Sequence, residues 1–99
     1  MAYVLRFTPT AAAVLDDLER STQFEKKLKK IRNALGRLEL DPRHRGLQSH
    51  RYESLSGPNG EPVWESYVEN RTPSAWRIWW WYGPVQGQIS VLSIGPHPD

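Results

Sequence analysis

The chain has 99 residues, no cysteine, 38% hydrophobic and 24% charged residues, and a formal net charge of +2. This length and composition predict one small globular domain over residues 1–99. The lack of cysteine excludes disulfide scaffolds, thiolate zinc sites and cysteine nucleophiles. The lack of a long apolar stretch and of a signal-peptide pattern predicts a cytoplasmic protein with no membrane partner.

The charge is distributed unevenly along the chain. The segment 26–51 holds nine Lys or Arg and two acidic residues, a net charge of +7, whereas the remainder holds four and nine, a net charge of −5. This asymmetry predicts a basic face of the kind that meets phosphates. The alternative is a solvated helix surface.

The first half of the chain predicts one strand and two helices. Residues 3–7 are β-branched or aromatic and predict a short strand, and Thr10 is the predicted cap of a helix over residues 11–20. A second helix follows a short break and ends near Leu40. Its apolar stripe comprises Phe24, Leu28, Ile31, Leu35 and Leu38. Two amphipathic helices with so short a connection predict an antiparallel hairpin.

The second half of the chain alternates in the manner of strands. The predicted strands are residues 50–55, 62–69, 75–82 and 88–94, separated by turn clusters. Short loops between consecutive strands favour an antiparallel meander. The predicted fold class is therefore α+β, with an N-terminal strand and a two-helix antiparallel hairpin packed on a mainly antiparallel sheet of four to five strands.

Strand alternation assigns two faces to residues 75–82. The side chains predicted to pack on the helices are Trp76, Ile78, Trp80 and Tyr82. The side chains predicted for the open face of the sheet are Arg77, Trp79 and Trp81. If Trp64 belongs to the core, the same alternation places Glu65 and Tyr67 on the open face beside Arg77.

Several segments, in their order and spacing, carry a resemblance over nearly the whole chain. They are Leu40-Asp41-Pro42-Arg43 after the second helix, Gly46-Leu47 before a strand, Ala75-Trp76-Arg77-Ile78, and residues 89–97, which end in Gly95-Pro96-His97. With the strand-helix-helix-sheet order, they resemble the RelE/ParE superfamily of bacterial type II toxins. The resemblance implies that family's fold and one of two activities. RelE-like members cleave mRNA in the ribosomal A site, whereas ParE-like members inhibit DNA gyrase without cleaving RNA.

The resemblance implies three catalytic candidates for the RelE-like reaction. That reaction is a metal-free attack of a ribose 2′-OH on the adjacent phosphate, which needs a base, an acid and a cation. Arg77 matches the family's strand arginine and suits phosphate, the alternative being an ion pair with Glu65 or Glu69. His97 matches the C-terminal histidine of several ribosome-dependent members, and its alternative is a histidine in a frayed tail. Glu65 is a candidate base, or else an exposed strand carboxylate.

A second group of residues is predicted to contact RNA. It comprises Arg43, Arg45, His50, Arg51, Tyr67, Trp79 and Trp81. The cationic members suit phosphates, and the aromatic members suit base stacking or the docking of a partner. The alternative for the aromatic members is a place in the core or over the sheet. His44 and His50 lack the close spacing of paired metal ligands, so neither a metal nor a cofactor is predicted.

The chain departs from the better understood nucleases in two respects. It lacks the paired middle-strand lysines of some RelE-like members and the tyrosine that commonly follows their last strand, so the base stays open among Glu65, His44, His50 and His97. Three hypotheses follow: an mRNA endonuclease toxin whose partners are the ribosome and mRNA, a non-enzymatic inhibitor of DNA gyrase, or a non-toxic antitoxin-binding domain. All three imply a cognate antitoxin as partner.

Overall fold

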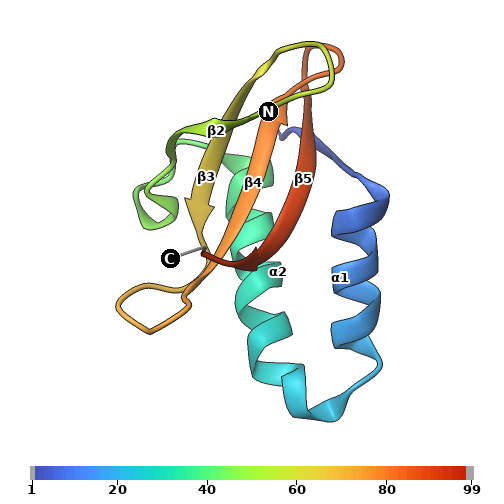
Figure 1. The fold of residues 1–99 in the computed structure, drawn as a ribbon, viewed down its shortest axis with the longest axis vertical. Helices are drawn as coiled ribbons and strands as arrows, with labels where there is room; N and C mark the ends of the chain where they lie inside the picture. Colours follow the sequence, from blue (N-terminus) through green and yellow to red (C-terminus); the bar gives the residue numbers. More distant parts are fainter. Residues whose placement is uncertain (1, 98–99) are drawn as a thin grey trace.

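A five-stranded sheet with two helices on one of its faces makes up the fold (Figure 1). The computed structural model describes residues 2–97. The main elements are β1 (Val4–Phe7), α1 (Pro9–Glu19), α2 (Glu25–Leu40), β2 (His50–Ser56), β3 (Pro62–Tyr67), β4 (Trp76–Tyr82) and β5 (Gln88–Pro96). Two single 3-10 turns, Thr22–Phe24 and Arg45–Leu47, precede α2 and β2. The predicted α+β class and the helix hairpin are confirmed.

The strands follow the order β1–β5–β4–β3–β2 across the sheet. Strands β2 to β5 form the predicted antiparallel meander. Strand β1 lies beside β5 and runs parallel to it, with Val4 opposite Gln88 and Phe7 opposite Val91. A parallel pair cannot be closed by a hairpin, so β1 reaches β5 only because the helices and the rest of the meander lie between them in sequence.

Helix α1 begins earlier than predicted. The Thr8 hydroxyl accepts a hydrogen bond from the Ala11 amide at 3.1 Å, and Pro9 occupies the first turn, where its missing N–H is not needed. The same hydroxyl donates to the Leu92 carbonyl at 2.7 Å. Thr8, rather than Thr10, is therefore the N-cap, and it ties the start of α1 to β5.

The helices bury their apolar stripes against the sheet. Helix α2 contributes Leu28, Ile31, Leu35 and Leu38, and the sheet contributes Ile78, Trp80, Ile89, Val91 and Ile94. Phe24, predicted as part of the stripe, is 38% exposed because it lies in the 3-10 turn before α2. Burial of each large apolar side chain contributes about 1.5–3 kcal/mol, so this layer dominates stability. Neither helix in residues 2–97 is long and apolar enough to cross a membrane.

The helix-side face of β4 follows the predicted alternation with one exception. Trp80 is fully buried, stacks on Trp64 with ring centroids 6.0 Å apart, and donates its indole N–H to the Ser66 hydroxyl at 2.8 Å. Tyr82, predicted to pack on the helices, is 43% exposed because it ends the strand beside Tyr3. Trp64 packs against the core, so its neighbours along β3 face the other way.

Candidate active site

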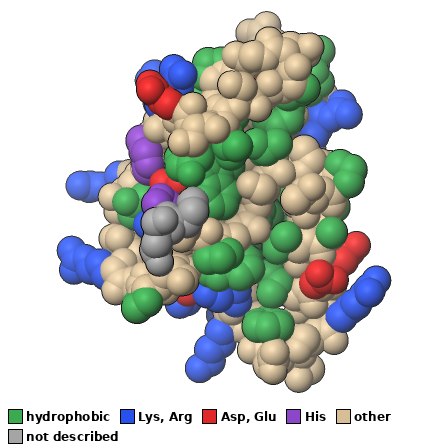
Figure 2. All heavy atoms as spheres, viewed as in Figure 1, with side chains coloured by type: hydrophobic (Ala, Val, Ile, Leu, Met, Phe, Trp, Pro, Cys, Tyr) green, Lys and Arg blue, Asp and Glu red, His purple; other side chains and the backbone are tan. Residues whose placement is uncertain are grey.

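The register between β3 and β4 brings the candidate catalytic residues onto the open face of the sheet. Glu65 pairs with Trp79, and Tyr67 pairs with Arg77. The shared face predicted from strand alternation is therefore confirmed. In the space-filling view, histidine side chains flank a small acidic patch on one side of the molecule (Figure 2).

Glu65 is a buried carboxylate, only 2% exposed, with four donors around it. Its Oε2 accepts from the Trp79 indole at 2.9 Å and lies 3.5 Å from His97 Nε2. Its Oε1 lies 2.9 Å from His50 Nε2 and 3.8 Å from Arg77 Nε. A buried carboxylate is tolerated only with such partners. The alternative of an exposed strand carboxylate is therefore wrong, and Glu65 is the centre of the site.

His50 is held between two acceptors. It begins β2 directly opposite Glu65, and its Nδ1 lies 2.9 Å from the carbonyl of Gln48, a residue in the left-handed conformation with φ of 47°. Both ring nitrogens of His50 therefore lie within hydrogen-bond distance of an oxygen acceptor. The Tyr67 ring meets His50 edge-on, with centroids 6.0 Å apart. His50, predicted as an RNA contact and as one of four possible bases, thus belongs to the group around Glu65.

His97 approaches the same carboxylate from the end of β5. Its backbone N–H donates to the Ala75 carbonyl at 2.9 Å, which continues the pairing with β4 past Pro96 and positions the ring. The side chain is 42% exposed, and within the described residues Nδ1 has no hydrogen-bond partner. With Nε2 directed at Glu65, Nδ1 is the ring nitrogen without a partner among the described residues.

Arg77 lies deeper than predicted for a phosphate contact. The residue is 9% exposed, and its guanidinium carbon lies 3.7 Å from the centroid of the Tyr67 ring. Its Nη1 donates to the carbonyls of Glu69 at 2.5 Å and Trp76 at 3.2 Å. The guanidinium fork is therefore turned inward, because Tyr67 covers it and the Glu69 carbonyl holds it. Its charge remains beside Glu65, as the ion-pair alternative proposed.

The Glu69 side chain ties the loop between β3 and β4 to helix α2, a contact that sequence reasoning missed. Its Oε1 lies 2.6 Å from Lys27 Nζ and accepts from the Trp76 amide at 3.2 Å, and its Oε2 lies 3.5 Å from Lys30 Nζ. Burial raises the pKa of Glu69, but the two hydrogen bonds and the two lysine charges outweigh it and lower the pKa overall. Lys27 and Glu69 are 42 residues apart, so no local spacing pairs them.

Trp79 and Trp81 do not offer the surface that stacking or docking requires. Each is only 6% exposed. Tyr52 of β2 packs on Trp79 with ring centroids 5.8 Å apart, and Trp81 lines a cavity with Pro58, which follows β2. Neither indole offers an exposed ring face for stacking or docking, because β2 and the turn after it cover this part of the open face.

The predicted basic RNA contacts divide between the two faces of the sheet. Arg43 and Arg45 line a cavity of about 410 Å³ together with Trp64, and the guanidinium carbon of Arg51 lies 5.8 Å from the centroid of the Trp64 ring. All three arginines therefore lie on the helix-side face, because residues 43–51 turn toward Trp64. The structure therefore does not bring these three arginines beside Glu65.

His44 has a local structural role instead of a catalytic one. Its Nδ1 accepts from the Gly46 amide at 2.9 Å and caps the turn before β2. In the part of the chain that the structure describes, no three His, Cys, Asp or Glu side chains are grouped so that they could hold a metal ion. The site is therefore one of proton-exchanging and cationic side chains around a carboxylate.

Comparisons with known proteins identify solved structures with the same fold as this chain. No protein-family model and no curated protein sequence matches the chain. A YoeB/ParE toxin from Agrobacterium tumefaciens is 13% identical with a TM-score of 0.69, over 96% of this chain and 99% of that one. RelE in an archaeal RelE-RelB complex from Pyrococcus horikoshii is 14% identical with a TM-score of 0.66, over 97% and 96%. The YoeB dimer from Staphylococcus aureus is 14% identical with a TM-score of 0.64, over 99% and 100%. The chain has the RelE/ParE-like fold.

Proposed function

We propose that this protein is the toxin of a type II toxin-antitoxin module and that it cleaves mRNA on the translating ribosome. The fold shared with solved RelE and YoeB toxins supports the toxin class, although a fold alone does not fix an activity. The observation that carries the nuclease assignment is the buried Glu65 carboxylate with His50, His97 and Arg77 directed at it. Such a group is suited to proton transfer beside a cation.

Each member of the group has a distinct task in cleavage by the ribose 2′-OH. His97 Nδ1 removes the 2′-OH proton while Glu65 holds the opposite nitrogen and stabilises the cation that forms. The 2′ oxygen attacks the adjacent phosphorus, and the bond from phosphorus to the 5′ oxygen breaks. His50, in its protonated form, releases the Gln48 carbonyl and returns its Nδ1 proton to the departing 5′ oxygen. Arg77 opposes the negative charge of the pentacoordinate phosphorus. The products are a 2′,3′-cyclic phosphate and a 5′-hydroxyl.

The proposed partners are the ribosome, its mRNA and a cognate antitoxin, all met in the cytoplasm. The basic residues of α2 and of residues 43–51 would hold ribosomal RNA by a salt-sensitive interaction that is independent of sequence. Two of the similar solved structures, from E. coli and Mycobacterium tuberculosis, are toxin-antitoxin complexes, which supports an antitoxin for this chain as well. The antitoxin would neutralise the toxin by covering the face that carries Glu65.

Primer extension on mRNA from cells that briefly express the protein tests this function. Wild type should create new 5′ ends within translated frames, and His97→Ala should lower their yield by about 10²–10⁴, the range for loss of a general acid or base. His44→Ala is the matched control, because it removes a histidine that caps a turn away from Glu65. Circular dichroism of the purified variants verifies that each one folds.

Two outcomes would contradict the nuclease assignment. Growth arrest with intact mRNA would favour the gyrase inhibitor, which a DNA supercoiling assay with purified gyrase would then establish. Normal growth on expression of the wild type would favour the non-toxic antitoxin-binding domain. Cleavage that persists in His97→Ala would leave the toxin class standing and remove His97 from the reaction.

A further inference from the structure

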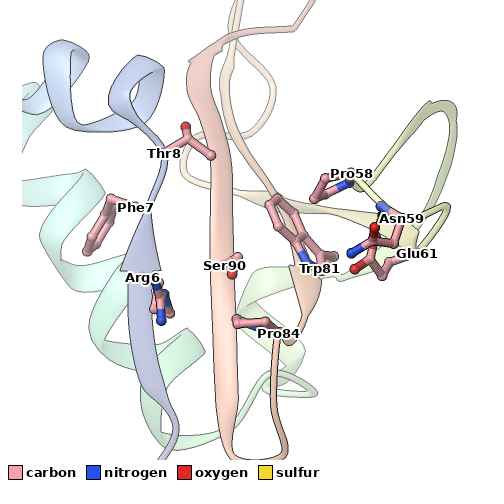
Figure 3. Close-up of a pocket in the computed structure, with 9 residues that line it drawn as sticks. All are labelled: Arg6, Phe7, Thr8, Pro58, Asn59, Glu61, Trp81, Pro84 and Ser90. Atoms are coloured by element: carbon pink, nitrogen blue, oxygen red, sulfur yellow. Dashed lines mark hydrogen bonds between the residues drawn. The ribbon is translucent and has the colours of Figure 1, made fainter.

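A second cavity lies at the other end of the open face, around Trp81 (Figure 3). Its volume is about 280 Å³, near the lower end for small-molecule pockets and suited to one planar ring system. The Trp81 indole N–H is buried and has no hydrogen-bond partner among the described residues. A buried donor without a partner is costly, so the indole would gain a hydrogen bond by turning its N–H toward an acceptor in the cavity.

The sheet register aligns the cavity's charged and polar groups in one row. Ser90 of β5 pairs with Arg6 on one side and with Trp81 on the other, so all three side chains share the open face. The Ser90 hydroxyl is already used, since it donates to the Gly83 carbonyl at 2.8 Å. Arg6 is exposed and makes no ion pair within residues 2–97. Two donors, the Arg6 guanidinium and the Trp81 N–H, thus belong to strands that lie about 10 Å apart on either side of β5.

The opposite wall of the cavity supplies an acceptor. Glu61 stands beside Trp81 with Asn59 and Pro58, all from the turn between β2 and β3 (Figure 3). Hydrogen bonds from the backbone of Glu61 and of Asn59 lower the pKa of Glu61, so the carboxylate is ionised at neutral pH. Its Oε1 accepts from the Asn59 amide at 2.7 Å, which fixes the side chain and leaves Oε2 for a ligand.

The cavity lies within reach of the candidate active site along one strand. Arg77 and Trp81 are four residues apart on β4 and face the same way, a separation of about 13 Å. A short single strand of RNA laid over this face would present one base to the cavity while its backbone passes Glu65. Unstacked bases are read in this way, by side chains that meet their polar edges.

We propose that this cavity is a base-recognition subsite that takes a guanine of the RNA substrate. Guanine offers acceptors, O6 and N7, to the Trp81 N–H and Arg6, and offers two donors, N1–H and the amino group, to Glu61. Adenine places an amino group where guanine has O6, and so opposes a donor with a donor. Two prolines, Pro58 and Pro84, also line the cavity and supply apolar contacts for the ring (Figure 3). The inference rests on the proposed function, because it makes RNA the ligand.

Nitrogen-15 NMR of the full chain with the four nucleoside 5′-monophosphates tests the subsite directly. The Trp81 indole signal is the one absent from Trp81→Phe. It should move with guanosine monophosphate at an affinity about fivefold or more above that for adenosine monophosphate, the least expected of a bidentate contact. Glu61→Gln should abolish this preference, since the amide still accepts from the Asn59 amide and keeps the turn. Asp17→Asn, the same carboxylate-to-amide change on the exposed side of α1, is the matched control and should leave the preference intact.

The binding readout separates this inference from the nuclease assignment. A guanine preference in the NMR titration upholds the subsite even if no RNA is cleaved, whereas cleavage without that preference overturns the subsite and leaves the nuclease standing. Equal shifts with all four nucleotides, or none, overturn it. A shift of the Trp81 signal produced by the cognate antitoxin and not by any nucleotide also overturns it and makes the cavity a protein contact.

Discussion

The tryptophans on the two faces of β4 differ in the hydrogen-bond acceptor that each indole N–H finds. On the helix-side face, Trp80 donates its indole N–H to a neutral hydroxyl, that of Ser66. On the open face, Trp79 donates to the Glu65 carboxylate, and Trp81 has no acceptor among the described residues. Three consecutive tryptophans, all at most 6% exposed, therefore have three different surroundings: a hydroxyl acceptor, a carboxylate acceptor and no acceptor. The helix-side face is an apolar core whose indole N–H has a partner, whereas the open face holds the Glu65 carboxylate and an indole N–H without one.

The largest expected effect is on the helix-side face. Trp80→Ala should lower the free energy of unfolding by about 3–5 kcal/mol, since it opens a cavity in the core beneath Trp64. Urea denaturation of the purified variant measures the loss. Tyr82→Ala is the comparison, because that ring is partly exposed at the end of the same strand. A loss for Trp80→Ala no greater than for Tyr82→Ala would mean that the helix side is not the main source of stability.

A smaller effect, and one that depends on pH, is expected beside the open face. Glu69→Gln should cost about 1 kcal/mol at pH 7, because it removes the ionised partner of Lys27. The pKa of Glu69 is lowered in the folded chain. Its contribution to the free energy of unfolding is therefore fully present above the pKa that Glu69 has in the unfolded chain, and it is lost as the pH falls through the pKa of the folded state.

Denaturation at a series of pH values measures the decline. The difference between wild type and Glu69→Gln should shrink below the ordinary carboxyl range near pH 4. Ser66→Ala, which removes the neutral acceptor of Trp80, should keep a difference from wild type that does not depend on pH in this range. If the Glu69→Gln difference is the same at pH 3 and pH 7, the ion pair with Lys27 does not hold the loop.

The smallest effect compares the two open-face indoles. Trp79→Phe should cost about 1 kcal/mol more than Trp81→Phe, because the first substitution removes a hydrogen bond to a buried carboxylate and the second removes a donor that has no partner. Both lose similar ring area, so the difference isolates the hydrogen bond. Equal costs in urea denaturation would show that Trp81 has an acceptor in solution.

The sequence predicted what depends on local periodicity. The period of two along β3 and β4 placed Glu65, Tyr67 and Arg77 on one face, and the apolar stripe of α2 identified the buried residues of that helix. The predicted start of α1 differs from the observed start by only two residues. Thr8 and Thr10 are the same residue type at either possible start, and the hydrogen bond from Thr8 to the Leu92 carbonyl selects Thr8 as the cap.

The predictions that failed concern contacts between segments that lie far apart in the sequence. The register of β2 against β3 shifts between Arg51 and Ser56. Strand β2 and the turn after it cover Trp79 and Trp81, and no residue spacing in the sequence predicts this contact. The inward turn of Arg77 likewise follows from the Glu69 carbonyl, which α2 holds in place through Lys27. Strand alternation gives the face of a side chain, but not its exposure.

The parallel pairing of β1 with β5 has a consequence for how the molecule folds. The hairpins β3–β4 and β4–β5 join neighbours in sequence, and they already contain Glu65 and Arg77. Strand β1 must instead close a loop of 84 residues, the separation of Thr8 and Leu92, before it gains any contact with β5. Loop closure of that length is entropically costly and slow. Docking of β1 should therefore be the late step of folding, and it completes the row that holds Arg6 beside Trp81.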